Sequence, residues 1–334
     1  MSSPSHVIVS MGILTPSLLT LLSFSAAQEG EQDAAEQVSS EGWVAALYSA
    51  HPKTRVVDLV LPGTHDSGSY AITPSSPPAP GAPDAYAKVG DIASAWSKTQ
   101  DQNLEEQLRG GVRYLDLRVA HFEDRLVLVH GLVSCDLNEA LAGVRRFARD
   151  EPREPVVLDL QAMPGESAHD ELDELLQEIL GDHLFAKASL PSKWTLGHLW
   201  SAKRALICIV DHSGFARREP EYRSRRLLDS VWTDSRKVEV LRGRLDSRLR
   251  GRDRDRLQCA YLTFTPELET IVASKLFGIG GLRSLSQPLF KLPGKWIPEW
   301  LEEGFRPNIV AVDFYEHTGV VDAVIRANQG LLAR

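Results

Sequence analysis

Short runs of β-branched residues and leucine alternate with helical patterns, and this alternation restricts the fold more than any other feature of the chain. Seven runs are predicted to be strands: Val56–Leu61, Tyr114–Val119, Leu126–Val129, Val156–Leu160, Ala205–Val210, Gln258–Phe264 and Ile309–Phe314. Helical patterns lie at Leu104–Arg109, Leu137–Arg149, His169–Leu180, Arg223–Leu228, Arg236–Arg250, Pro266–Phe277 and Val320–Asn328. This order is typical of repeated βα units, so we expect an α/β fold with parallel strands.

Periodicity alone does not distinguish an open doubly wound sheet from a closed barrel. The glycines at 278–281 have the wrong spacing for a dinucleotide fingerprint and follow a helical pattern, so they are interpreted as a loop. Ser75–Pro83 is rich in proline and glycine and is expected to form an extended loop. A length of 334 residues fits two average domains, although α/β barrels reach it as one domain.

The N-terminus has the outline of a signal peptide. Val7–Phe24 is largely apolar, small residues follow at Ser25–Ala27, and Gln28–Glu36 is acidic, although no lysine or arginine precedes the apolar run. We expect a leader at 1–27, a polar linker at 28–42 and a folded unit at 43–334, in a secreted or extracytoplasmic protein. A retained membrane anchor and a disordered leader are the alternatives.

Charge and cysteine content exclude some classes of protein. The net charge of −8 argues against a nucleic-acid partner. The segment Arg217–Arg256 carries 14 basic and 8 acidic residues, which indicates either a solvated helical face with mixed charges or a surface that meets anionic lipids. Cys135, Cys208 and Cys259 lack C-x-x-C spacing, so neither a zinc site nor a disulfide scaffold is indicated, and the last two are expected in the core.

Chemically useful side chains occur at the predicted carboxyl ends of the strands, where parallel α/β folds bind their ligands. The candidate catalytic residues are His65, Asp66, Asp116, Arg118, His130 and Asp313. His65 follows the first strand and Asp313 lies on the last, so a shared site requires these strands to meet. This requirement favours one ring of strands over two domains.

Two histidines, several acids and an arginine are what metal-free cleavage of a phosphodiester needs. A neutral histidine removes a proton from the attacking hydroxyl, and a protonated histidine donates a proton to the leaving oxygen. Carboxylates fix the imidazole tautomers, and arginine binds the phosphate oxygens. Taken singly, each residue also has a structural reading: a capping histidine, an N-cap at Asp66, or an ordinary ion pair between Asp116 and Arg118.

The motifs Leu61–Ser67, Gln107–Arg118 and Val129–Gly131 resemble the X domain of phosphatidylinositol-specific phospholipases C. Weaker similarity continues through Pro155–Leu160, Thr195–Trp200 and Asn308–Phe314, so that the resemblance covers about Val56–Asn328. It implies that residues 43–334 form a single TIM-type (β/α) catalytic barrel, often imperfectly closed. It also implies cleavage of phosphatidylinositol by its own inositol 2-hydroxyl, giving diacylglycerol and a cyclic inositol phosphate that is hydrolysed slowly.

The resemblance also implies roles for the residues. His65 matches the general base and His130 the general acid, with Asp66 supporting His130. Asp313 is the candidate partner of His65. Asp116 and Arg118 match an Asp-x-Arg element at the phosphate.

Arg118 also bears on the cofactor. Calcium-dependent members of the family carry an acid at this position, because a hard cation needs several carboxylates. Gln161 stands where those enzymes have another acid and some bacterial ones have lysine. We therefore expect no cofactor and calcium-independent activity. The inositol-binding residues are not matched securely, and the nearest candidates for substrate binding are Gln161, Asp211 and Tyr261.

The expected partner is an inositol phospholipid or a glycosylphosphatidylinositol at a membrane surface, bound by a monomer. Trp296 and Trp300 indicate either an interfacial anchor or a helix packed on the barrel. Two alternative functions remain: a barrel that binds lipid or phosphoester without turnover, and a phosphodiesterase of the same superfamily that acts on another head group, such as a glycerophosphodiester.

Overall fold

The computed structural model describes residues 39–82, 90–186, 189–230, 232–267, 270–271 and 280–334. Val38–Arg334 form one compact unit. The predicted leader, most of the predicted linker, most of the helical pattern Pro266–Phe277 and residues 278–279 lie outside the described residues. Within the described ranges, no helix is long and apolar enough to cross a membrane.

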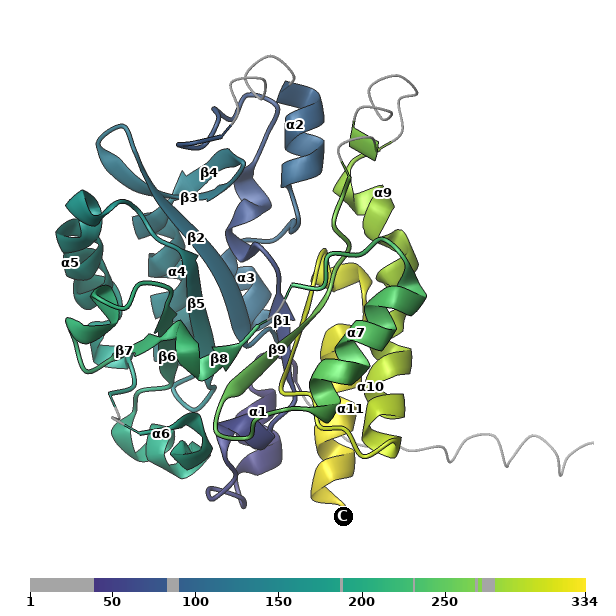
Figure 1. Cartoon of the computed structure of the whole chain (residues 1–334). Coiled ribbons are helices and arrows are strands. Elements are labelled where there is room, and N and C mark those ends of the chain that lie inside the picture. The colour runs from purple at the N-terminus through teal and green to yellow at the C-terminus, as the bar shows by residue number, and fades with distance from the viewer. Residues whose placement is uncertain (1–38, 83–89, 187–188, 231, 268–269, 272–279) are drawn as a thin grey trace, which may run out of the picture. The chain divides into compact units, whose positions relative to one another are not determined.

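A curled sheet of parallel strands forms the centre of this unit (Figure 1). Its order is β7 (Tyr222–Ser224), β6 (Leu206–Val210), β5 (Val156–Ala162), β2 (Tyr114–Phe122), β1 (Leu61–Thr64), β10 (Ile309–Val312), β9 (Leu257–Leu262) and β8 (Leu228–Asp229). Each neighbouring pair is parallel. The edge strands β7 and β8 are joined through Arg225–Leu227, and no ladder between them occurs in the described part of the chain. The predicted barrel, imperfectly closed, is therefore confirmed.

One predicted parallel strand belongs to a hairpin instead. Leu126–Val129 lies in β3 (Arg125–His130), which pairs antiparallel with β2 and with β4 (Leu132–Asp136). Only Glu123 and Asp124 separate β2 from β3, whereas a parallel connection needs about a dozen residues. The described part of the proline-rich segment is a loop, as predicted, although it contains turns, and its backbone bonds to this hairpin at Gly131 and Val133.

Two further predictions need correction. Val56–Leu61 is not one strand: Val56–Asp58 form a 3-10 turn, and β1 begins at Leu61. The Asn308 side chain holds this turn by donating to the carbonyls of Val56 and Leu59. The predicted helix Arg223–Leu228 is instead β7, a 3-10 turn and the start of β8, because ladders with β6 and β9 satisfy its backbone.

Helices surround the sheet (Figure 1). They are α1 (Trp43–Tyr48), α2 (Gly90–Ser97), α3 (Leu104–Arg109), α4 (Leu137–Asp150), α5 (His169–Leu180), α6 (Leu196–Ala202), α7 (Val238–Arg250), α9 (Leu282–Ser286), α10 (Leu292–Glu302) and α11 (Val320–Leu332). The predicted patterns for α3 and α5 match their bounds, and those for α4, α7 and α11 differ at the ends. In α4, for example, Leu141, Val144 and Phe147 are buried, as an amphipathic helix requires.

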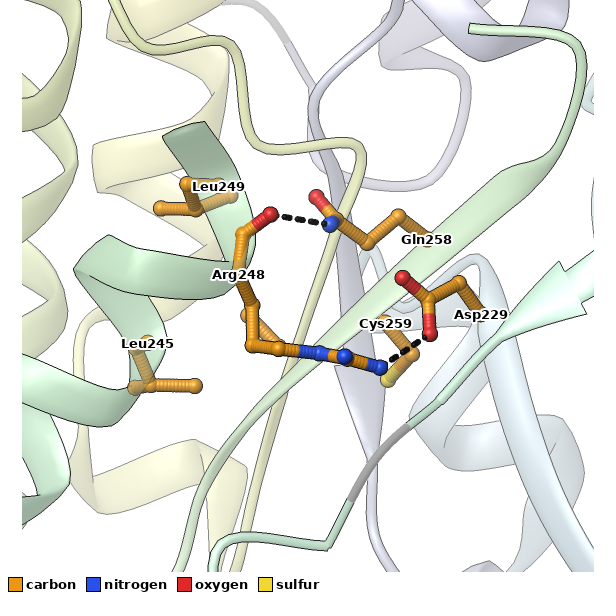
Figure 2. Close-up of a pocket in the computed structure, with 7 residues that line it drawn as sticks. Asp229, Leu245, Arg248, Leu249, Gln258 and Cys259 are labelled. Atoms are coloured by element: carbon orange, nitrogen blue, oxygen red, sulfur yellow. Dashed lines mark hydrogen bonds and ion pairs between the residues drawn. The ribbon is translucent and has the colours of Figure 1, made fainter. Parts of the chain in front are cut away.

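Arginines of α7 form ion pairs with neighbouring elements. Arg242 pairs with Asp246, Glu299 and Glu303. Figure 2 shows Arg248 pairing with Asp229, 2.7 Å away, while its carbonyl accepts from Gln258, beside a cavity of about 10 Å³. That volume holds about one water. These contacts favour the mixed-charge reading of this helix.

The tryptophans of α10 face the protein interior. Trp296 and Trp300 are buried, and the Trp300 indole donates to Asp246, 2.6 Å away. The interfacial-anchor interpretation of this pair is therefore wrong. All three cysteines are free, and Cys208 and Cys259 are buried as predicted.

A buried ion pair connects α1 to the sheet. Arg113 and Glu154 have no exposed side-chain surface and approach to 2.7 Å. Glu154 also accepts from the backbone N–H groups of Val44 and Ala45 at the start of α1. Arg113 donates its remaining protons to backbone carbonyls, including those of Leu108 and Val112.

We expect Glu154→Gln to lower the free energy of unfolding by about 3–5 kcal/mol, because the Arg113 charge remains buried without its counterion. Urea unfolding followed by circular dichroism measures this loss. Asp150→Asn, in solvent-accessible pairs with Arg149 and Arg109, is the control and should cost much less. Equal losses in the two variants would contradict the assigned role of Glu154.

Candidate active site

The six predicted catalytic residues lie together, near the carboxyl ends of β1 and β10 and beside the part of β2 that pairs with β5. His65 and Asp66 directly follow β1, and Asp313 directly follows β10. Asp116 and Arg118 belong to β2. The sixth residue, His130, comes from the end of the hairpin strand β3, and its ring centroid lies 6.0 Å from that of His65. The sheet order and the hairpin thus place all six at one point.

The Asp66 carboxylate lies between three basic side chains. Its Oδ2 is 3.0 Å from His65 Nε2 and 2.9 Å from His130 Nε2, and its Oδ1 pairs with Arg118 Nε. Burial raises the pKa of Asp66, but the neighbouring His130, His65 and Arg118 outweigh burial and hold it well below its usual range.

Asp66 has a left-handed backbone conformation, with φ of 42° and ψ of 53°. This conformation is strained for a residue with a side chain, and such strain concentrates at functional sites. Neighbours hold the turn: Thr99 Oγ1 donates to the carbonyls of His65 and Asp66, and Gln100 Nε2 donates to that of His65. The fold therefore stabilises the backbone conformation that points Asp66 at the two histidines.

His65 is held by carboxylates at both ring nitrogens. Its Nδ1 lies 2.8 Å from Asp313 Oδ1, and Ser286 donates to the other oxygen of Asp313. Because a carboxylate only accepts, Nδ1 carries a proton, and Nε2 is the nitrogen that titrates. Burial lowers the pKa of His65, but Asp66 and Asp313 outweigh burial and raise it to about 9.

His130 takes its tautomer from the backbone. Its Nδ1 donates to the Ser97 carbonyl at the end of α2, 2.7 Å away. Its Nε2 can therefore donate to Asp66 only when the ring is cationic. Sequence reasoning missed Ser97, because a carbonyl that acts through the backbone leaves no mark in the residue type.

Asp116 is fully buried, and neither of its carboxylate oxygens has a hydrogen-bond partner among the described residues. Burial, followed by the charge of Asp66, raises the pKa of Asp116 to about 6. Donor atoms of His65, Asp66 and Asp116 lie within 4.8 Å of one another, a spacing that a cation can use. The Arg118 guanidinium, 3.9 Å from Asp116, already brings positive charge to this cluster.

The three predicted substrate-binding residues belong to a second, adjoining network. Gln161 donates to the Tyr261 hydroxyl, which lies 2.7 Å from the Tyr114 hydroxyl. Tyr114 in turn donates to Asp159, 2.7 Å away. The Tyr261 ring lies 5.7 Å from that of His65, so this network adjoins His65.

Arg225 connects Asp211 to the same network. Its Nε donates to Asp159 at 3.3 Å, and its Nη1 lies 4.0 Å from Asp211. Sequence reasoning missed Tyr114, Asp159 and Arg225 as site residues. The sequence did contain a signal for two of them, because alternate residues of a strand share a face. Tyr114 lies two residues before Asp116 in β2, and Asp159 lies two residues before Gln161 in β5.

Trp232 covers one side of His65. Its ring centroid lies 4.8 Å from that of His65, and its indole N–H donates to Thr265 Oγ1. The residue is 37% exposed, and among the large apolar side chains of the described residues only Leu190 and Val240 are more exposed. Sequence reasoning missed this neighbour as well.

We expect Asp159→Asn to change how stability depends on pH. Burial raises the pKa of Asp159 to about 7, although Arg225 opposes this. A raised carboxyl pKa stabilises the fold at low pH, and this contribution is lost as pH rises from about 4 through 7. The wild type should therefore lose on the order of 4 kcal/mol relative to the variant across this range. Urea unfolding at several pH values measures the difference, and a pH-independent difference would contradict the assignment.

The sequence is similar to that of one family of known proteins. Residues 92–209 match the family described as "Phosphatidylinositol-specific phospholipase C, X domain". The chain is 26% identical over 304 residues to human PI-PLC X domain-containing protein 3, covering 86% of this chain and 92% of that protein. It is 28% identical over 310 residues to mouse PI-PLC X domain-containing protein 2, covering 88% of this chain and 89% of that protein.

Solved structures show the same fold. The phosphatidylinositol-specific phospholipase C of Listeria monocytogenes superposes with a TM-score of 0.64 at 16% identity, over 87% of this chain and 99% of that one. The corresponding Staphylococcus aureus enzyme gives a TM-score of 0.60 at 16% identity, over 87% and 98% of the two chains.

Proposed function

Because the chain belongs to the proteins that carry the phosphatidylinositol-specific phospholipase C X domain, we propose that it cleaves the glycerophosphate bond of phosphatidylinositol or a related inositol phospholipid. One observation carries the proposal: two imidazoles and a guanidinium meet around the Asp66 carboxylate. Metal-free cleavage of a phosphodiester needs three such groups, since one acts as a base, one acts as an acid and one binds the phosphate oxygens.

In the proposed reaction, neutral His65 takes a proton from the inositol 2-hydroxyl at Nε2. The oxygen attacks phosphorus, and the bond to the glycerol oxygen breaks. His130 gives its Nε2 proton to that oxygen, releasing diacylglycerol and a cyclic inositol phosphate. Arg118 stabilises the charge that develops on the phosphate oxygens. In a slow second step, His130 removes a proton from water and the water oxygen attacks phosphorus. The bond from phosphorus to the inositol 2-oxygen breaks, and His65 returns its Nε2 proton to that oxygen.

The proposed substrate-binding residues are Gln161, Asp211 and Tyr261, joined by Tyr114, Asp159 and Arg225. Their hydroxyl, amide, carboxyl and guanidinium groups supply both donors and acceptors, as a polyol head group requires. The network adjoins His65, so a head group held there presents its hydroxyl to the proposed base. The signal-peptide outline supports action outside the cytoplasm, at a membrane surface.

We also propose that no metal takes part. The support is the position of Arg118, whose side chain pairs with Asp66 and lies beside Asp116. A fixed guanidinium there supplies the charge that a calcium ion would bring, and it repels a cation from those carboxylates.

His65→Gln and His130→Gln are each expected to lower kcat/KM on phosphatidylinositol vesicles by at least about 10²-fold, because each removes a proton-transfer step. Phosphorus NMR should detect the cyclic phosphate as first product, and turnover should persist in EDTA. His121→Gln, which changes an exposed histidine paired with Glu171, is the matched control and should retain activity.

The alternatives give different results in the same assay. Vesicle binding without any product would indicate a lipid-binding barrel. Product from another head group but not from phosphatidylinositol would indicate a related phosphodiesterase. Unchanged turnover in both histidine variants would reject the mechanism, and loss of activity in EDTA would reject its metal-independent part.

In the pH profile of kcat/KM, Asp66→Asn should shift the acid limb to lower pH. His65 must lose its Nε2 proton to act as a base, so activity in the free enzyme should rise towards pH 9. Removing the negative charge of Asp66 destabilises the protonated imidazole and so lowers the pKa of His65. The pH–rate profiles of the two proteins test this, and an unmoved or raised limb would contradict it.

A further inference from the structure

A second concentration of positive charge lies at the opposite ends of the barrel strands from the catalytic residues. A surface pocket of about 380 Å³ is lined by Thr54, Arg55, Asp58, Arg254 and Arg306, with Tyr48, Leu331 and Leu332. Three of these residues lie just before strands: Asp58 before β1, Arg254 before β9 and Arg306 before β10. These strands are parallel, so the pocket opens at their amino ends.

The arginines in and behind this pocket outnumber the acids. Asp58 pairs with Arg55, and Arg254 lies 3.4 Å from the same carboxylate. Arg252 lies just behind, donates to the carbonyls of Val57 and Arg306, and keeps a buried Nε without a hydrogen-bond partner among the described residues. Asp255, which accepts from Ser192, is the second acid of this region. The guanidinium groups thus number four, those of Arg55, Arg252, Arg254 and Arg306, against the two carboxylates of Asp58 and Asp255.

This excess of positive charge affects the arginines themselves. Burial first, and then repulsion from Arg254 and Arg55, lowers the pKa of Arg252 to about 10. Burial and the charges of Arg334 and Arg254 also lower the pKa of Arg306. An anion seated between these groups would relieve the repulsion, and Arg254, with a side chain that is 54% exposed, is open to one.

We propose that this pocket is a binding site for an organic phosphate, separate from the catalytic residues. Arginine binds phosphate through two parallel hydrogen bonds, which suits Arg254 and Arg306. The volume falls within the range of small-molecule sites, and Leu331 and Leu332 form an apolar wall for the organic part. The phosphate can belong to a soluble phosphomonoester or to a lipid head group. The site is independent of the proposed catalysis.

Isothermal titration with glycerol 3-phosphate tests the proposal, with glycerol as the uncharged control. We expect Arg254→Gln to weaken binding by about tenfold or more. Arg149→Gln is the matched control, since Arg149 is an exposed arginine that also pairs with a single carboxylate, Asp150, and it should leave binding unchanged. Arg118→Gln removes phosphate binding at the catalytic residues and should retain binding at the pocket.

Binding to phosphatidylcholine vesicles, measured with and without phosphatidic acid, tests whether the bound phosphate belongs to a lipid. Binding of phosphatidic acid vesicles, lost in Arg254→Gln but kept in Arg118→Gln, supports the same site with a lipid-borne phosphate. Binding of glycerol 3-phosphate with the same pattern supports a soluble ligand. Equal binding by the wild type and Arg254→Gln, or no binding of either probe, would overturn the proposal.

Discussion

The ion pairs of the shared Asp66 carboxylate organise the end of the barrel that holds the six candidate catalytic residues. One buried acid contacts two imidazoles and a guanidinium, so the three basic groups converge without an exposed counterion. The turn that carries it is strained, and its carbonyls are held by Thr99 and Gln100. Gln100 also donates to the Val312 carbonyl, which ties this turn to the end of β10.

Sheet order and one tight turn explain why residues so distant in sequence meet. β1 lies between β2 and β10, so the ends of the first, second and last barrel strands are neighbours. The hairpin then returns His130 to the same point, because only two residues separate β2 from β3. The opening between β7 and β8 leaves Arg225, in the turn that joins them, able to reach Asp159.

Much of this arrangement follows from sequence, since His65, Asp116 and Asp313 each lie on or just after a hydrophobic run that predicts a strand. The hairpin was not predicted, because the run at Leu126–Val129 looks the same in a parallel or an antiparallel strand. Arg225 was assigned to a helix, because its short segment acquires strand structure only by pairing with neighbours distant in sequence. Ser97 acts through its carbonyl, which any residue carries.

The central claim is that the carboxylates around His65 keep its imidazole protonated in the substrate-free protein. ¹⁵N NMR of the histidine side chains across pH 5 to 10 measures this directly. The structure predicts that both nitrogens of His65 carry protons at pH 7 and that Nε2 loses its proton near pH 9. A neutral His65 at pH 7, titrating near or below the ordinary value of about 6.5, would contradict the account.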